Sequence, residues 1–194
     1  MTQPPLPPGD LLLHAGDLSI VGSQAEIQEQ LTWLSSQLHT HKIVITGNHD
    51  VLFDPAFLEA NPVRKFMNLD AKASDLNLGS VIYLQDESVT LKLAKGGVER
   101  ELKIYGSPKT PQYGSSAFQV PPTQDVWSGK APEETDILLT HGPPRNHLDG
   151  GLRAGCINLA REVMRVRPRV VLFRHVHAGY GIEEVRLDRV RSLY

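Results

Sequence analysis

The sequence predicts a single α/β domain in which short parallel strands are joined by helices. A short apolar run at residues 11–15 is followed by an amphipathic segment at residues 23–39 and by a second apolar run at residues 42–46. A strand, helix and strand in this order are typical of a right-handed parallel crossover. No repeat or change of composition divides the 194 residues, so we expect one domain over residues 1–194.

The first crossover carries clear local signals. Ser23 followed by Glu26 predicts a capping box at the start of a helix over residues 23–39. Apolar residues then recur at helical spacing, namely Ile27, Leu31, Leu34 and Leu38. We expect this stripe to face the core. The parallel crossover then places the ends of the two strands, at Asp17 and Asn48, at the same edge of a sheet.

The rest of the chain alternates between extended and helical patterns. Residues 55–78 are interpreted as short helices interrupted by proline, and residues 81–84, 88–93 and 99–105 as strands, with Lys95-Gly96-Gly97 as a hairpin turn. Residues 106–131 contain several prolines and glycines, which predicts a long surface loop of the kind that often borders a binding site. A strand at 136–140, a helix at 156–167 ended by Pro168, and a strand at 169–173 follow.

Composition argues against several classes of partner. The chain has 20 Lys and Arg against 22 Asp and Glu, a formal charge of -2, which does not favour a nucleic-acid polymer or an anionic membrane. No apolar run approaches the roughly 18 residues of a membrane helix. Cys156 is the only cysteine, so no intrachain disulfide can form and we expect a reducing, cytoplasmic location. A small phosphorylated molecule suits this composition, whereas the oligomeric state is left open.

Four polar segments each follow a predicted strand: Gly16-Asp17, Gly47-Asn48-His49-Asp50, His141-Gly142 and His175-Val176-His177. In open α/β sheets, ligands bind at the carboxyl ends of strands. One such residue alone is more often a turn or cap residue, but four in agreement favour a site. Asp, Asn and His donors suit Mn, Fe, Zn or Mg, and no clustered thiolates indicate structural zinc.

Two details of these segments bear on the geometry of a metal site. Gly47 allows either a close backbone approach or a positive φ, which would leave the Asn48 amide oxygen to meet a cation. His175 and His177 are two residues apart and would point the same way if the last strand continued through them.

With these motifs the chain resembles the calcineurin-like metallophosphoesterases, and among them the subgroup of metallophosphoesterase-domain-containing proteins. The resemblance runs over nearly the whole chain and includes the contexts His14-Ala15-Gly16-Asp17 and Thr140-His141-Gly142-Pro143. It implies a four-layer α/β/β/α sandwich. It also implies that two metals are bridged by Asp17, that Asn48, His141 and His175 complete one metal, and that His177 binds the other. His49 matches the proton donor to the leaving oxygen, with Asp50 expected to orient its imidazole.

The chain departs from the family pattern at three places. No Asp-x-His motif precedes Asp17, so we expect one metal site, and two only if the missing ligands are supplied. We also expect the first strand of the fold to be missing and residues 187–194 not to pack in the family manner. Arg174 replaces the glycine of the family's Gly-His-x-His motif. Its guanidinium could clamp a phosphate, repel cations, or turn out to solvent.

The resulting functional hypothesis is a metal-dependent phosphoesterase acting on phosphomonoesters or phosphodiesters, including nucleotides, with weak activity because one metal site is incomplete. His49 and Asp50 are the expected catalytic residues. The expected metal ligands are Asp17, Asn48, His141, His175 and His177, and Arg174 and Asn48 are expected to contact substrate. The alternative, favoured by the missing motif, is a non-catalytic protein that binds phosphate or a nucleotide.

Overall fold

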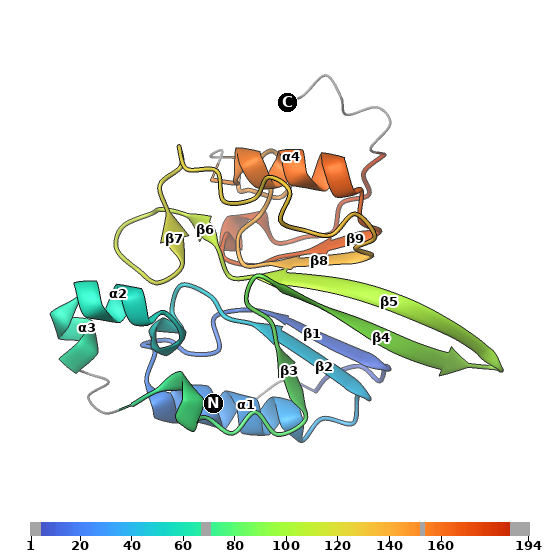
Figure 1. Cartoon of the computed structure of the whole chain (residues 1–194), viewed down its shortest axis with the longest axis horizontal. Coiled ribbons are helices and arrows are strands. Elements are labelled where there is room, and N and C mark those ends of the chain that lie inside the picture. Colours follow the sequence, from blue (N-terminus) through green and yellow to red (C-terminus); the bar gives the residue numbers. More distant parts are fainter. Residues whose placement is uncertain (1–4, 67–70, 152–153, 187–194) are drawn as a thin grey trace.

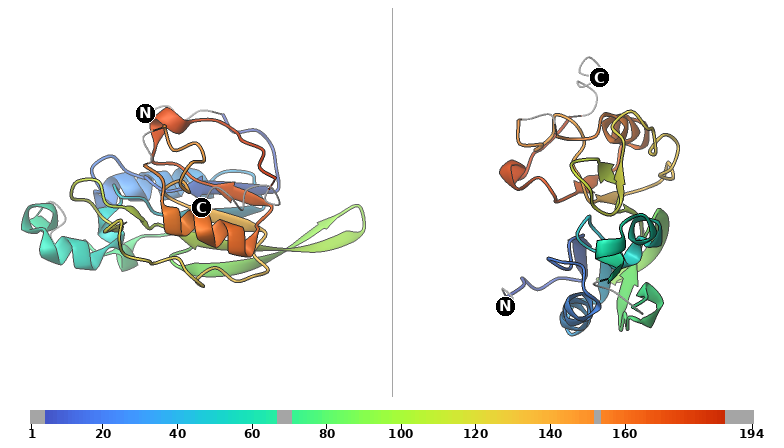
Figure 2. Two further views of the ribbon diagram at one scale, coloured as in Figure 1. Left: turned by 90° about the horizontal axis from the view of Figure 1, so that it is seen from above. Right: turned by 90° about the vertical axis from the view of Figure 1, so that its left-hand side faces the viewer.

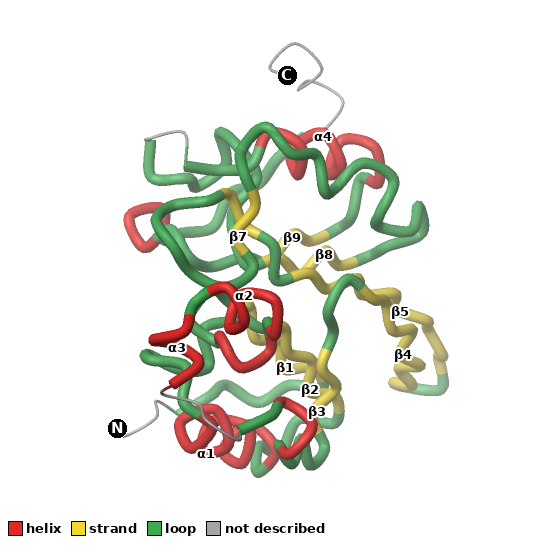
Figure 3. Tube along the Cα trace, turned by 60° about the vertical axis from the view of Figure 1, so that its left-hand side comes forward, coloured by secondary structure: helices red, strands yellow, loops and turns green. Residues whose placement is uncertain are grey.

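Two β-sheets lie face to face between two long helices, in the order α/β/β/α. The computed structural model describes residues 5–66, 71–151 and 154–186. Helix α1 (Gln24–Ser35) covers the outer face of one sheet, and α4 (Ile157–Val166) covers the outer face of the other (Figures 1 and 3). The predicted four-layer α/β fold is confirmed. No helix in the described ranges is long and apolar enough to cross a membrane.

The first sheet is parallel throughout, in the order β1-β2-β3. It consists of β1 (Leu11–Ala15), β2 (His41–Ile45) and β3 (Val81–Tyr83). Helix α1 joins β1 to β2, and the Ser23 hydroxyl accepts the Glu26 N–H at 3.3 Å, so both the parallel crossover and the predicted cap are present. The strand ends that carry Asp17 and Asn48 therefore lie at one edge of this sheet.

The second sheet is mixed, in the order β4-β5-β8-β9. The strands β4 (Glu87–Lys95) and β5 (Val98–Ser107) form an antiparallel ribbon that projects past the neighbouring strands (Figure 1). The hairpin turn predicted at Lys95-Gly96-Gly97 is present: Lys95 pairs with Val98, and Gly96 and Gly97 between them have φ of +60° and +79°. The strands β8 (Ile137–Thr140) and β9 (Val170–Leu172) add in parallel.

Short elements fill the connections. The proline-interrupted segment forms η1 (Val51–Phe53), α2 (Pro55–Ala60), α3 (Pro62–Phe66) and η2 (Ala73–Asp75). The segment 106–131 contains β6 (Thr110–Pro111) and β7 (Gln119–Val120). It is not wholly a surface loop, because Trp127 is only 1% exposed and packs with α4 residues. The last short helix is η3 (His177–Gly179).

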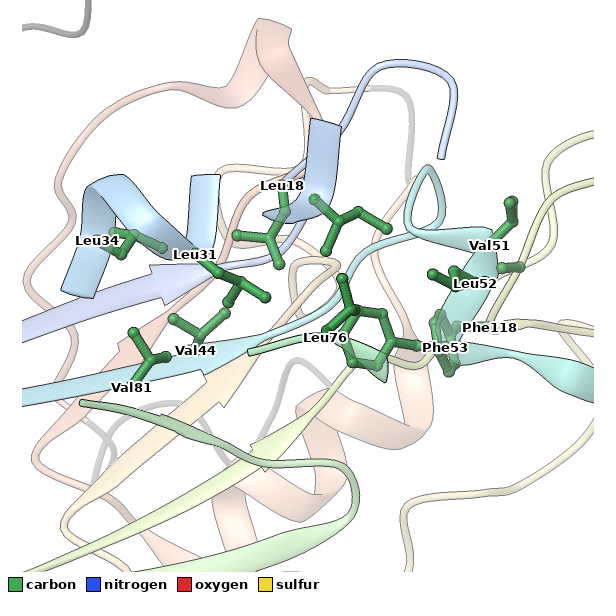
Figure 4. Close-up of a cluster of buried hydrophobic side chains, with 12 residues drawn as sticks. Leu18, Leu31, Leu34, Val44, Val51, Leu52, Phe53, Leu76, Val81 and Phe118 are labelled. Atoms are coloured by element: carbon green, nitrogen blue, oxygen red, sulfur yellow. The ribbon is translucent and has the colours of Figure 1, made fainter. Parts of the chain in front are cut away.

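The core is layered because alternate residues of each central strand face opposite sides. In β2, Val44 packs under α1 with Leu31, Leu34 and Val81 (Figure 4), whereas Ile43 and Ile45 face the second sheet. In β8, Leu139 faces the first sheet and Leu138 packs under α4. The right-hand view in Figure 2 shows the same stacking from the side. Both sheets are thus held rigidly beneath the loops that follow their strands.

Two expectations about element ends are wrong. Helix α1 ends at Ser35 rather than at residue 39, and Leu38 is fully exposed instead of joining the core stripe. The Ser36 hydroxyl bonds the Trp33 carbonyl at 2.7 Å, a local bond that competes with further helix. Strand β9 ends at Leu172, so His175 and His177 do not share one face of a strand. The expectation for residues 187–194 lies outside the described residues.

Candidate metal centre

Three of the predicted metal ligands converge from strand ends of both sheets. Asp17 follows β1, Asn48 follows β2 and His141 follows β8. The Nε2 atom of His141 lies 2.9 Å from Oδ1 of Asn48 and 3.4 Å from Oδ1 of Asp17. His141 is fully buried, and the Asp17 side chain is only 9% exposed. Residues separated by more than a hundred positions therefore present their donor atoms to a common point.

Glycine is required where these loops meet. A Cβ on Gly47 would lie 2.3 Å from Oδ1 of Asp17 and 2.4 Å from Cε1 of His141. Gly16, at φ +94°, is equally crowded, because a Cβ there would lie 2.7 Å from both Gly47 N and Nδ1 of His141. Of the two reasons considered for Gly47, the close approach of backbone to the donor atoms is the one that the structure supports.

The hydrogen bonds of His141 determine which atom can bind a cation. Its Nδ1 lies 2.9 Å from the carbonyl oxygen of Ala15, which can only accept, so Nδ1 carries the hydrogen. Burial lowers the pKa of His141 to about 4, so the imidazole is neutral near pH 7 and Nε2 holds a lone pair. That lone pair faces two side-chain oxygens. A backbone carbonyl bonded to the other ring nitrogen is typical of histidines that bind metals, and Ala15 supplies such a carbonyl to His141.

The orientation of the Asn48 amide is set by Ser116. Nδ2 of Asn48 donates to the Ser116 hydroxyl at 3.3 Å, and that hydroxyl donates to the Asn48 backbone carbonyl at 2.5 Å. Oδ1 of Asn48 is therefore turned toward His141. Sequence analysis did not identify Ser116, but it lies in segment 106–131, so this segment does border the site.

The two remaining predicted ligands are placed differently. The ring of His175 lies beside that of His141, with centroids 4.9 Å apart and planes tilted by 59°. His177 begins η3 and is exposed, and no described hydrogen bond or ring contact joins it to the three converging donors. Across residues 5–66, 71–151 and 154–186, no group of three or more His, Cys, Asp or Glu side chains is arranged to hold a metal. The third converging donor is an amide oxygen, from Asn48.

His49 is exposed next to these donors. Its Nδ1 lies 2.6 Å from the carbonyl oxygen of Ile20, which can only accept, and its backbone N–H donates to Oδ1 of Asp17 at 3.2 Å. The Ile20 carbonyl fixes the ring and leaves Nε2 for exchange of a proton. No residue pattern predicts this partner, because the acceptor is a backbone atom.

Asp50 does not orient the imidazole of His49, so that expectation is wrong. The buried carboxylate instead accepts the N–H of Gly47 at 2.8 Å, of Leu18 at 3.0 Å and of Ser19 at 2.9 Å, together with the Ser19 hydroxyl at 2.7 Å. Burial raises the pKa of Asp50, although these donors act in the opposite direction. Asp50 joins the loop after β1 to the loop after β2, so it positions the site.

Arg174 links the loop after β1 to His141 through hydrogen bonds. Its Nη1 donates to the carbonyl oxygens of Gly16 at 2.8 Å and Asp17 at 2.9 Å. Its backbone N–H donates to the carbonyl of His141 at 2.9 Å. Of the three alternatives for this side chain, a guanidinium turned away into solvent does not fit these bonds. Both roles at the site, phosphate contact and repulsion of cations, fit the position of the charge.

Two predicted ligands have strained backbones. Asp17 has φ +54° and His175 has φ +69°, the left-handed region that L side chains rarely adopt. Such conformations cost on the order of 1–3 kcal/mol each and concentrate at functional sites. The left-handed backbone at two of the predicted ligands is therefore consistent with a functional site at this position.

The four-layer sandwich and the converging oxygen and nitrogen donors define the metallophosphoesterase class of α/β proteins. A sequence model of calcineurin-like phosphoesterases matches residues 3–179. The chain belongs to the calcineurin-like phosphoesterase family, whose members are metal-dependent phosphoesterases that generally bind divalent ions.

Named relatives agree with this assignment. Metallophosphoesterase domain-containing protein 1 of Homo sapiens is 37% identical, over 91% of this chain and 57% of its own length. A UPF0046 protein of Caenorhabditis elegans is 36% identical, over 91% of this chain and 48% of its own length. A probable rhamnogalacturonate lyase C of Emericella nidulans is 41% identical, over the whole chain but only 18% of its own length. The chain thus spans less than two thirds of each of these relatives.

Proposed function

We propose that this chain hydrolyses small phosphomonoesters or phosphodiesters, nucleotides among them, with the help of one divalent metal ion. One observation carries the proposal. Nε2 of His141 lies 2.9 Å from Oδ1 of Asn48 and 3.4 Å from Oδ1 of Asp17, and because the ring hydrogen is on Nδ1 no hydrogen lies between Nε2 and these oxygens. Three electron-pair donors so close together repel one another unless a cation lies among them.

Asp17, Asn48 and His141 are therefore the residues that would hold the ion, with His175 beside them. A carboxylate, an amide oxygen and an imidazole suit Mn, Fe, Zn or Mg. A divalent ion in this position supplies Lewis-acid chemistry, activating water and neutralising charge on the phosphoryl oxygens. His177 and further ligands would be needed for a second ion.

Arg174 is proposed to contact the phosphoryl group, because its guanidinium lies over the Gly16–Asp17 loop and only Nη1 has described hydrogen-bond partners there. A guanidinium donates to phosphate oxygens through two nitrogens at once. Asn48 belongs to the same donor group and is proposed to contact substrate through its amide.

His49 is proposed to protonate the leaving oxygen. The Ile20 carbonyl holds its Nδ1–H, so the ring is fixed while Nε2 stays exposed. A positioned proton donor contributes roughly 10²- to 10⁴-fold to rate. Asp50 supports this step only indirectly, by fixing the loop on which His49 stands.

Replacing His49 tests the proposal, because the role assigned to it separates catalysis from metal binding. With manganese present, His49→Ala should lower turnover of a generic phosphodiester by about 10²-fold or more while metal content stays unchanged. His41→Ala, at the other end of β2, is the matched control and should leave both unchanged. Equal loss of turnover and metal content in His49→Ala would contradict the assigned role.

A non-catalytic phosphate or nucleotide binder is the second candidate, and one observation favours it. Arg174 places a fixed positive charge over the Gly16 and Asp17 carbonyls, where it can hold an anion without chemistry. Calorimetry with a nucleotide and manganese, run beside a hydrolysis assay, separates the two candidates. Tight binding without any turnover would rule out the phosphoesterase.

A further inference from the structure

Strand β4 is an unusually open sheet edge. It forms the outer strand of the order β4-β5-β8-β9, so within the described residues one side of its backbone has no strand partner. The register with β5 runs without a bulge from Glu87↔Gly106 to Lys95↔Val98, and β4 contains no proline. Proteins usually protect such edges by shortness, bulges, proline or charged side chains, because an open edge recruits another strand. The nine-residue strand β4 has no bulge or proline, and Lys92 is the one charged residue in its middle.

The hairpin turn determines which backbone groups face outward. In a two-residue hairpin the pair flanking the turn, here Lys95 and Val98, is hydrogen bonded, and the hydrogen-bonded pairs then recur at every second residue. The residues between them direct their N–H and C=O groups to the free side of β4. These residues are Ser88, Thr90, Lys92 and Ala94, and all four are exposed.

We propose that β4 pairs with β4 of a second copy of this chain, antiparallel and centred on Leu91. In this register Thr90 lies opposite Lys92 of the second copy, and Ser88 lies opposite its Ala94. Every outward-facing residue then meets another outward-facing residue, so the pairs can form a regular antiparallel ladder. The contact is the same on both copies, as a two-fold dimer requires, and it joins the two mixed sheets into one.

The side chains fit the register centred on Leu91 better than the registers shifted by one residue in either direction. In this register Val89, on the face that packs toward the core, meets Leu93 of the second copy, and Leu91 meets its own counterpart. Moving the centre to Thr90 would place Glu87 opposite Leu93. Moving it to Lys92 would place two lysines directly opposite each other, which is unfavourable. The strand is therefore self-complementary around Leu91, with apolar residues opposite apolar ones on the core face and no like charges opposed.

Charge changes at Thr90 test the interface by sedimentation over a range of concentrations. The parent chain should form a dimer. Thr90→Lys puts a like charge opposite Lys92 twice and should raise the dissociation constant by about tenfold, whereas Thr90→Glu should lower it. Glu99→Gln, on β5 away from the free edge, changes the net charge as Thr90→Lys does and should have no effect. A chain that is monomeric at all concentrations, or a dimer indifferent to Thr90, overturns the proposal.

Disulfide formation tests the register independently, in a Cys156→Ser background. The pair Thr90→Cys and Lys92→Cys in one chain should give a covalent dimer on mild oxidation, since the two positions lie opposite each other between copies. Thr90→Cys alone should not, because the Thr90 residues are not opposed. Both variants are checked for an unchanged thermal unfolding midpoint. A folded double variant that stays monomeric, or equal cross-linking of both, excludes this pairing.

Discussion

Oδ1 of Asp50 accepts both the backbone N–H and the hydroxyl of Ser19, at 2.9 and 2.7 Å, across 31 positions of sequence. The same carboxylate accepts the N–H groups of Leu18 and Gly47 through Oδ2. The loop that carries Asp17 and the loop that carries Asn48 are thus fixed to each other by one buried side chain.

Asp50→Ala should lower the free energy of unfolding by about 3 kcal/mol, because it leaves several buried donors without an acceptor. Asp50→Asn, which keeps one acceptor oxygen, should lower it by less. Urea unfolding measures both, and metal content should fall with stability. If Asp50→Ala unfolds like the parent and loses only turnover, the carboxylate takes part in chemistry instead.

Gly47→Ala should abolish metal binding, because its Cβ would overlap Oδ1 of Asp17 and Cε1 of His141. We expect a loss of about 2 kcal/mol in stability as well, the usual cost of overpacking. Gly97→Ala is the matched control: nothing lies within 4 Å of its Cβ, so only the strain of φ +79° remains, and metal content should not change. Metal analysis after dialysis and gel filtration distinguishes the two variants.

The α/β class and the three converging donors could be predicted from the sequence because they depend on local signals, whereas the four-layer arrangement was expected only from the family resemblance. The cap at Ser23, the apolar runs and the position of Asp17, Asn48 and His141 after strands are all visible in residue types. The parallel crossover brings the strand ends of Asp17 and Asn48 together at one edge of the first sheet, whereas His141 follows a strand of the second sheet.

What the sequence could not predict depends on backbone direction and on partners without a residue pattern. The position of Asp50 next to His49 suggested contact, yet the chain turns so that Asp50 faces inward and His49 outward. The carbonyls of Ala15 and Ile20 orient the two histidines, and any residue offers a carbonyl. Likewise strand β9 ends at Leu172, and the left-handed backbone at His175 keeps its side chain from aligning with His177 as on an extended strand.

His14 should make stability depend on pH below neutrality. Burial, with a smaller effect of Arg174, lowers its pKa from 6.5 to about 4, and its Nδ1 has no hydrogen-bond partner among the described residues. The unfolded chain therefore binds a proton that the folded chain does not, and stability falls as pH drops from 6.5 toward 4. Between about pH 7.5 and pH 5 the loss should be about 1–2 kcal/mol.

His14→Leu should remove that part of the pH dependence, as measured by urea unfolding at each pH. His141, whose pKa burial also lowers to about 4, should leave part of the slope in place. An unchanged slope in His14→Leu would mean that His14 stays neutral in the unfolded chain over this range or is protonated when folded.

We expect Glu162 to make the largest contribution of any charged residue to the stability of α4 and the loop that packs on it. It is 2% exposed, and it accepts the N–H groups of Gly129 and Ala131 together with the guanidinium of Arg165. Glu162→Ala should cost about 3 kcal/mol, because it leaves two amides without their acceptor and removes the buried carboxylate partner of Arg165. Glu133→Ala removes an exposed partner of the same arginine, 3.6 Å away, and should cost less than about 1 kcal/mol. Comparable losses for the two variants in thermal unfolding would show that burial does not decide their contributions.

Arg174→Ala should weaken binding of inorganic phosphate about tenfold, the usual effect of losing a charge-assisted hydrogen bond at a partly exposed site. Calorimetry with manganese present measures this affinity. Arg174→Lys should restore only part of it, because an ammonium group cannot donate two parallel hydrogen bonds to a phosphate as a guanidinium does. Unchanged phosphate affinity with tighter metal binding would instead indicate that Arg174 acts by repelling cations.

The three converging donors belong to separate sheets, since Asp17 and Asn48 follow strands of the first and His141 follows a strand of the second. The distances between these donor atoms therefore depend on how the two sheets are positioned against each other. Warming that lets the sheets slide by a fraction of an ångström would disperse the donors while each sheet is still intact, so heat inactivation should precede melting. Substitutions in the apolar layer that contains Ile43 and Leu139 should then change the temperature at which the donors separate, although none of the donor residues is altered.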